Sequence, residues 1–114
     1  MVKIKFKNPI FNKGINYTVR LGEKWAKILN IGDKVNLDDV DVGIISRIDV
    51  SYFSLINPVV WIFNHDPECR KGKGHLWEVL KKIYGPTKTA GSTSSRSDFL
   101  DVHNTVVTSI EFYI

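Results

Sequence analysis

The stretch 14–37 constrains the fold most, because it joins a strand, a helix and a second strand within a short span. Residues 15–20 include Tyr, Thr and Val, which fit a pleated, half-buried surface. A helix over 21–29 is predicted by apolar residues at i, i+3 and i+4 spacing, namely Trp25, Ile28 and Leu29. Gly32-Asp33 then predicts a turn into a strand at 34–37, where apolar and polar residues alternate.

Three further segments are predicted to be strands. Residues 2–7 alternate apolar residues with lysine, which is typical of a half-buried strand with a charged outer face. Residues 42–56 are rich in β-formers and predict one long bent strand or two strands, with Gly43 as a bulge or bend. Residues 102–114 form the last predicted strand.

Two helices follow the long strand region. Asn57-Pro58 has the residue types of a helix cap and first helical position, so a short helix is expected there. A second helix is predicted over 75–84, with Gly85-Pro86 as its stop. Its apolar residues have i, i+3, i+4 and i+7 spacing: Leu76, Val79, Leu80 and Ile83. The Ser/Thr-rich segment 86–99 is predicted to be a flexible loop within the same domain.

Length and composition indicate one domain spanning 1–114. A chain of 114 residues supports one core, and 43% hydrophobic with 25% charged residues is ordinary for a soluble globular protein. The single cysteine, Cys69, excludes an intrachain disulfide and favours a reducing, cytoplasmic location. The sequence has neither an apolar run of membrane-spanning length nor the apolar region of a signal peptide. The element order predicts an α+β fold: a small mixed β-barrel with two or three helices packed on it.

Several short motifs occur in the order found in one known family. They are Gly14, Thr18-Val19-Arg20, Gly32-Asp33-Lys34-Val35, a helix end at 81–85 and a final strand at 106–112. In this order the chain resembles the ASCH domains of the PUA-like superfamily. The resemblance spans nearly the whole chain and implies a PUA-like β-barrel. It also implies a ligand cleft at the end of the strand that carries Thr18 and Arg20.

Thr18 and Arg20 are the first candidate site residues. Residues two apart on a strand point to the same face, so a hydroxyl and a guanidinium could converge on one anionic or carbonyl-bearing ligand. The alternative is a structural arginine in an ion pair at the barrel rim. The family resemblance favours the ligand-binding interpretation, because it places the cleft at this strand end.

A larger basic set suggests a polyanionic partner. The formal net charge is +4, which favours nucleic acid modestly. The candidate nucleic-acid-binding residues are Arg20, Lys24, Lys27, Arg70, Lys71 and Lys73. They would form one patch if the connector 64–74 folds over the helix at 21–29, and such clusters neutralise phosphates. Nearby Tyr17, Trp25 and Trp77 could stack on unpaired bases, although each also fits a core pattern. The alternative for the basic set is a plain solvated face.

The family resemblance also raises a catalytic hypothesis. In some ASCH proteins a Lys, a Thr and a Glu hydrolyse the acyl group of acetylated cytidine. Thr18 matches the Thr, but Ile15 stands where the Lys would be, and the Glu would be either Glu68 or Glu78. The departure counts against this activity. If the chain is an enzyme, the candidate catalytic residues are Thr18, Arg20, Lys24 and Glu68.

A metal site is not expected. Zinc sites need three or four ligands at short, regular spacing. The only cluster of suitable residues has one cysteine and histidines that straddle a lysine-rich segment: His65, Asp66, Glu68, Cys69 and His75. Cys69 has no surrounding nucleophile motif. No cofactor is implied by the sequence.

The leading hypothesis is therefore a small module that binds RNA or a nucleotide-like ligand in a basic cleft. The first alternative is an enzyme of the same fold, either an amidohydrolase acting on a modified nucleoside or a nuclease. The second alternative is a protein-interaction module whose basic face meets an acidic partner. Salt-dependent binding of single-stranded RNA would separate the first hypothesis from the last.

Overall fold

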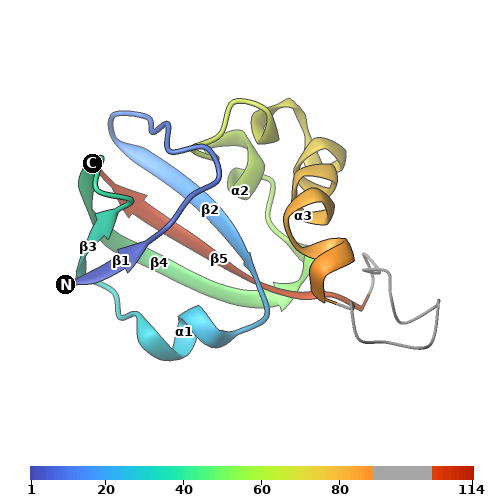
Figure 1. Cartoon of the computed structure of the whole chain (residues 1–114), viewed down its shortest axis with the longest axis horizontal. Coiled ribbons are helices and arrows are strands. Elements are labelled where there is room, and N and C mark those ends of the chain that lie inside the picture. Colours follow the sequence, from blue (N-terminus) through green and yellow to red (C-terminus); the bar gives the residue numbers. More distant parts are fainter. Residues whose placement is uncertain (89–103) are drawn as a thin grey trace.

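A computed structural model of the chain describes residues 1–88 and 104–114, apart from the side chains of 84–88. It shows an α+β protein in which one five-stranded mixed sheet has two helices on one side and a single short helix on the other (Figure 1). The strand order is β1-β3-β4-β5-β2. The strands are β1 (Val2–Ile4), β2 (Ile15–Leu21), β3 (Lys34–Leu37), β4 (Asp41–Tyr52) and β5 (Val106–Tyr113).

The sheet is mixed because β1 pairs with β3 in parallel, whereas every other neighbouring pair is antiparallel. β1 and β2 are the two outer strands of the described sheet, and no ladder joins them. The predicted α+β class is therefore confirmed, and the described sheet is open. The sequence left one or two strands possible at 42–56, and the structure has one, β4, followed by a 3-10 turn, η1 (Phe53–Leu55).

The helices are short except for one. α1 (Lys24–Ile28) connects β2 to β3, and α2 (Val59–Ile62) follows η1. Asn57, the residue before the N-cap Pro58, supports the start of α2, since its Oδ1 accepts a hydrogen bond from the Val59 amide at 3.0 Å. A second 3-10 turn, η2 (Cys69–Lys71), leads into α3 (Lys73–Lys88), the long helix that stands beside β5 in Figure 1.

Buried apolar side chains form a separate cluster on each side of the sheet. α2 and α3 cover the first cluster, whose buried members are Tyr17, Val19, Phe53, Ile56, Val60, Cys69, Leu76, Leu80 and Val107. β1, β3 and the end of α1 enclose the second, whose buried members are Ile4, Leu29, Val35, Leu37, Ile45, Ile110 and Phe112. Burial of these side chains is the main force that holds the helices on the sheet.

The first strand is shorter than its alternating pattern predicts. β1 ends at Ile4, and the chain leaves the sheet at Lys5. The Phe6 amide bonds to the Asp38 carboxylate at 3.1 Å, and the Phe6 ring packs edge-on against Phe11. The Phe6 amide thus bonds to a side chain distant in sequence, and its ring packs on Phe11, where a continued strand would have bonded to a neighbouring strand. This detour carries the segment 5–8 across the molecule, and that position matters for the site below.

Two other local expectations are corrected. α1 begins at Lys24, later than the apolar spacing predicts, because β2 continues to Leu21 and Gly22 adopts φ +77°. The irregularity in β4 lies between Ile45 and Arg47, not at Gly43. Gly43 serves close packing instead, because an added Cβ would lie 3.0 Å from Cδ1 of Leu37.

α3 continues past its predicted stop. It runs through Gly85 and Pro86 to Lys88, so the first residues of the segment 86–99 are helical instead of forming a loop. A proline removes only one backbone donor, and near a helix end this loss does not prevent another turn. The rest of the predicted loop, 89–99, lies outside the described residues.

Candidate functional site

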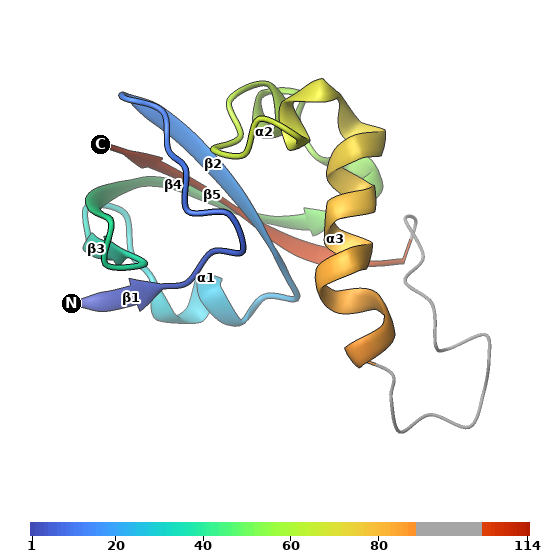
Figure 2. The same cartoon turned by 45° about the horizontal axis from the view of Figure 1, so that its top comes forward.

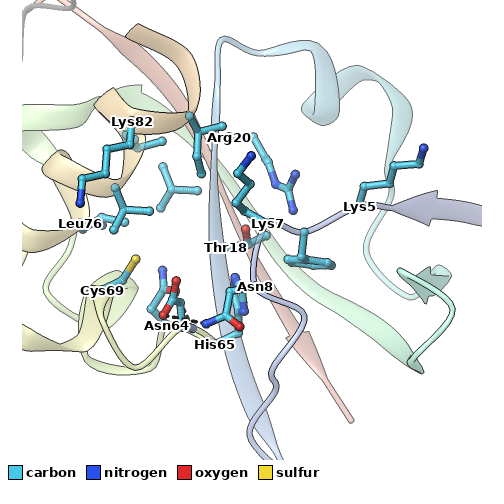
Figure 3. A pocket seen from close by; sticks show the side chains of 16 residues that line it. Lys5, Lys7, Asn8, Thr18, Arg20, Asn64, His65, Cys69, Leu76 and Lys82 are labelled. Atoms are coloured by element: carbon cyan, nitrogen blue, oxygen red, sulfur yellow. Dashed lines mark hydrogen bonds between the residues drawn. The ribbon is translucent and has the colours of Figure 1, made fainter.

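A cavity of about 450 Å³ opens beside β2. Three other segments wall it: residues 5–8, residues 64–69 and the middle of α3. Figure 3 shows β2 at the back of this space, with α3 on one side and the segment 5–8 on the other. Segments far apart in the sequence therefore meet here.

Thr18, Val19 and Arg20 of β2 all line the cavity. Thr18 and Arg20 point to one face of the strand, as their spacing predicts, and Val19 points to the other face. Thr18 is only 4% exposed, so its hydroxyl is held in a largely dry environment. The structure therefore brings the predicted Thr18–Arg20 pair to one concave site.

Phe6 holds Arg20 in place. The guanidinium carbon of Arg20 lies 4.7 Å from the centroid of the Phe6 ring, which is a cation–π arrangement. The other contacts of this ring fix its orientation, since it meets His65 edge-on with 4.7 Å between ring centroids. Three cavity residues from three segments thus support one another.

His65 is a neutral imidazole in this site. Its Nδ1 lies 2.9 Å from the Ile10 carbonyl oxygen, which can only accept, so Nδ1 carries the proton. The other ring nitrogen, Nε2, is therefore an acceptor. Burial is the main cause that lowers the pKa of His65 to about 4, with Arg20 and Arg70 acting in the same direction. At neutral pH the cavity therefore contains an uncharged acceptor in place of a cation.

Hydrogen bonds fix the segment that carries His65. Oδ1 of Asn64 accepts from the Asp66 amide at 3.0 Å, and Nδ2 of Asn64 donates to the Val60 carbonyl at 3.4 Å. Oδ1 of Asp66 accepts from Nδ2 of Asn8 at 3.3 Å and from the Glu68 amide at 2.9 Å. The Asn8–Asp66 bond ties the walls 5–8 and 64–69 together, so the cavity is preformed at this corner.

The wall formed by η2 and α3 is mostly apolar. Leu76, Val79, Leu80 and Ile83 line it, in agreement with the predicted apolar stripe of this helix. Cys69 also lines the cavity, and burial raises the pKa of its thiol to about 12. The thiol is therefore protonated at neutral pH and behaves as a small apolar group.

Three lysines complete the lining, and the sequence analysis did not select them. Lys5 and Lys7 come from the segment after β1, and Lys82 comes from α3. Figure 3 shows Lys82 and Lys7 on different walls of the cavity. The alternation of lysines in 2–7 was a visible signal, but it was interpreted as the outer face of a strand. The position of Lys5 and Lys7 follows from the early end of β1.

The predicted basic set does not gather at the cavity as a whole. Of its six members, Arg20 alone is among the described lining residues. Lys24 and Lys27 are exposed on α1, which both Figure 1 and Figure 2 place away from α2 and the start of α3. Lys27 pairs with Glu23 at 3.3 Å on the same helix.

The other basic candidates lie near η2. Arg70 and Lys71 are exposed there, and Lys71 pairs with Glu68 at 2.9 Å. Lys73 begins α3 and donates to the Ser54 carbonyl at 2.6 Å. The connector 64–74 thus packs on β2 and α3 and does not fold over α1.

The catalytic candidates are also dispersed. Thr18 and Arg20 share the cavity, whereas Lys24 and Glu68 do not line it. Glu68 is exposed, and its carboxylate contacts Lys71 and His75. Lys71 and His75 together lower the pKa of Glu68, so it is held as a carboxylate. Ile15 packs against the cluster under α2 and α3, on the face opposite to Thr18.

Of the proposed stacking residues, Tyr17 is 2% exposed and belongs to the first cluster. Trp77 is half-buried and packs against the same cluster, and Trp25 is half-buried and packs against the second cluster. These three rings therefore pack in the cores. Phe6 lines the cavity instead, and the sequence analysis did not select it.

Within 1–88 and 104–114, no group of three or more His, Cys, Asp or Glu side chains is arranged to hold a metal ion. Among the described helices, none has the length and apolar character needed to cross a membrane. Comparisons with known protein families, with curated proteins and with solved structures find no match to the chain.

Proposed function

We propose that this protein binds RNA or a nucleotide-like ligand in the cavity beside β2. The observation that carries the proposal is the charge of the lining. Lys5, Lys7, Arg20 and Lys82 contribute four cations, and Asp66 contributes one described carboxylate. An anionic group such as a phosphate is the ligand chemistry that this excess of positive charge attracts.

The rest of the cavity suits a nucleoside. Its volume of about 450 Å³ falls within the range of small-molecule sites, which are mostly apolar with a few placed polar groups. The apolar wall of α3 offers surface to a base or sugar. The Thr18 hydroxyl and the neutral His65 ring offer hydrogen bonds near the opposite wall.

Arg20 has a defined part in this proposal. Its guanidinium, held over Phe6, is the best-positioned cation of the site and would bind a phosphate or a carbonyl oxygen of the ligand. The lysines at 5, 7 and 82 would add positive electrostatic potential at the mouth of the cavity. Arg70 and Lys71 are exposed on η2, the turn that contributes Cys69 to the cavity wall, and would act on a longer RNA strand.

The family assignment belongs to the same proposal. Membership in the ASCH family would imply that the open sheet corresponds to a PUA-like barrel, with the cavity as its ligand cleft. The order of the motifs and the convergence of Thr18 and Arg20 support this assignment. We place the activity in the cytoplasm because the single cysteine is typical of a reducing compartment.

Salt-dependent binding of a fluorescently labelled single-stranded RNA tests the proposal. Three double variants are compared with the wild type: Lys7→Ala/Lys82→Ala at the cavity, Arg70→Ala/Lys71→Ala at η2, and Lys24→Ala/Lys27→Ala on α1 as the matched control. Binding should weaken with salt, and the cavity variant should reduce the slope of log K against log salt by about 1.4. The α1 variant should retain the wild-type slope.

Two outcomes would refute this function. The first is the absence of RNA binding at 50 mM salt, where phosphate contacts are strongest. The second is binding that the α1 variant abolishes and the cavity variant leaves intact. An acidic protein partner that bound with the same residue dependence, in the absence of RNA binding, would favour the protein-interaction alternative.

A further inference from the structure

The backbone of β2 presents a hydrogen-bonding edge to the cavity. In an antiparallel pair, residues alternate between those that bond to the partner strand and those that point away from it. Gly14 and Ile114 exchange both amide–carbonyl bonds, at 3.3 and 3.1 Å, so they are a bonded pair. The register between β2 and β5 then makes the following bonded pairs: Asn16–Phe112, Thr18–Ile110 and Arg20–Thr108. Tyr17, Val19 and Leu21 therefore point their amides and carbonyls away from β5.

Tyr17 shows where the outward groups go. Its amide donates to the Phe63 carbonyl at 2.9 Å, and its carbonyl accepts from the His65 amide at 3.0 Å. This short parallel bridge is formed by the segment that carries Asn64 and His65. The bridge ends there, because the segment turns away towards η2.

Val19 is the next outward residue, and within 1–88 and 104–114 neither its amide nor its carbonyl has a hydrogen-bond partner. The cavity touches Thr18, Val19 and Arg20, although their side chains lie on alternate faces of the strand. A cavity that is lined from both faces of an outer strand extends around the edge of that strand that has no partner strand. This cavity therefore lies at the open edge of β2. The amide and carbonyl of Val19 therefore face the cavity.

We infer that the Val19 amide and carbonyl bind the Watson–Crick edge of an unpaired nucleobase. This inference rests on the proposed function and names the part of the ligand that the cavity selects. Every nucleobase carries a donor next to an acceptor on that edge. The Val19 carbonyl would accept from the base, and the Val19 amide would donate to it. The base would thus continue the short ladder where the segment 63–65 ends.

An extended peptide is the other class of ligand that pairs with the edge of a strand. It needs several outward residues in a row. On β2, Tyr17 is already bonded to 63–65 and separates Ile15 from Val19 and Leu21, and of these three outward residues only Val19 lines the described cavity. The four cations of the lining also favour a phosphate-bearing ligand over a neutral strand. The geometry therefore favours a base over a peptide.

Base methylation tests the inference without changing the protein. The probes are labelled tetranucleotides of uridine, whose base has N3–H as its one Watson–Crick donor, and their counterparts methylated at N3. Methylation removes the donor hydrogen and retains the phosphates and the net charge. We expect it to weaken binding about tenfold or more, since it leaves the Val19 carbonyl without its partner.

The outcomes separate the two proposals. Equal affinity of methylated and unmethylated probes would overturn the base-edge inference and leave the proposed function intact. No binding of either probe at 50 mM salt would overturn both. A third outcome would assign the β2 edge to a peptide. In that case an extended peptide that pairs with β2 would displace the probes, and methylation would have no effect on probe binding.

Backbone variants provide the second arm. Val19→Pro removes the outward amide and no β2–β5 bond, and proline is tolerated at such positions of an edge strand. Leu21→Pro makes the same change at the outward residue that does not line the cavity, and Val19→Ala shortens the side chain but keeps the amide. Thermal melting identifies variants that fold. Val19→Pro should bind the unmethylated probe about tenfold more weakly than Val19→Ala, and Leu21→Pro should bind it as the wild type does. Equal affinities of all three variants for the probe would contradict the inference.

Discussion

The Arg20 guanidinium and the Phe6 ring are stacked 4.7 Å apart, and this contact joins the end of β2 to the segment that follows β1. Phe6 also contacts Phe11, His65 and Phe112. A single half-buried ring therefore holds the cation of the site, the histidine of the site and the second core cluster together.

Phe6→Leu should accordingly reduce both stability and binding. Loss of the aromatic contacts should lower the free energy of unfolding by about 1–2 kcal/mol. RNA affinity should fall several-fold, because Arg20 loses the surface that orients it. Denaturant unfolding and fluorescence anisotropy measure the two effects. Phe63→Leu is the matched control, since Phe63 is 43% exposed and should change stability by less than about 0.5 kcal/mol.

His65 should make stability depend on pH. Its folded pKa of about 4 lies below the usual 6.5, so the unfolded chain binds this proton more readily. Stability should therefore be full above pH 6.5 and fall as the pH decreases to 4, by on the order of 3 kcal/mol. Urea unfolding between pH 7 and 5 measures the upper part of the loss, and His65→Gln should flatten that part.

His75→Gln is the control for the pH experiment, because His75 is exposed. It should leave the slope between pH 7 and 5 unchanged. A wild-type stability that stayed constant over this range would show that His65 is not buried as a neutral ring.

Cys69 should be unreactive while the protein is folded. With a thiol pKa of about 12 instead of 9.0, the thiolate fraction at pH 8 falls by on the order of a thousandfold. Alkylation by iodoacetamide should be correspondingly slow and should reach the rate of a free cysteine in urea. Rapid labelling of the native protein would mean that the wall formed by η2 opens readily.

Acetylated cytidine should not be hydrolysed at an enzymatic rate. Ile15, which stands where the family resemblance implies a Lys, has no lone pair or transferable proton and packs on the face away from Thr18. The lysines that line the cavity are exposed, and water screens the charges around them, whereas a nucleophilic lysine is activated in a desolvated site. The assay is release of acetate, with Thr18→Ala as the control. Turnover near one per second that Thr18→Ala removes would establish a hydrolase instead.

Sequence periodicity was sufficient for the elements that are regular. The strands at 15–20 and 34–37 and the apolar stripe of α3 were predicted correctly, because alternation and helical spacing reflect one buried face. The spacing of Thr18 and Arg20 predicted their shared face, and the family resemblance implied a cleft beside them. These features are local, so a single segment carries the whole signal.

The remainder of the site depends on contacts between distant segments. Lys7 and Lys82 reach one cavity because β1 ends early, and the end of β1 depends on Asp38 and on the packing of Phe6. Lys24 joins the predicted patch only if the connector 64–74 folds over the helix at 21–29, but α1 carries it away from the cavity. The spacing of residues along the chain predicts neither the meeting of Lys7 and Lys82 nor the position of Lys24.

The most direct test of ligand binding in this cavity is an amide NMR titration of the labelled protein with uridine 5′-monophosphate and with a single-stranded tetranucleotide. The account predicts the largest shift changes at residues 18–20 and 64–66, with the Val19 amide among them, and little change on α1. Changes confined to α1 or to the surface of β4, or no change at millimolar ligand, would contradict it.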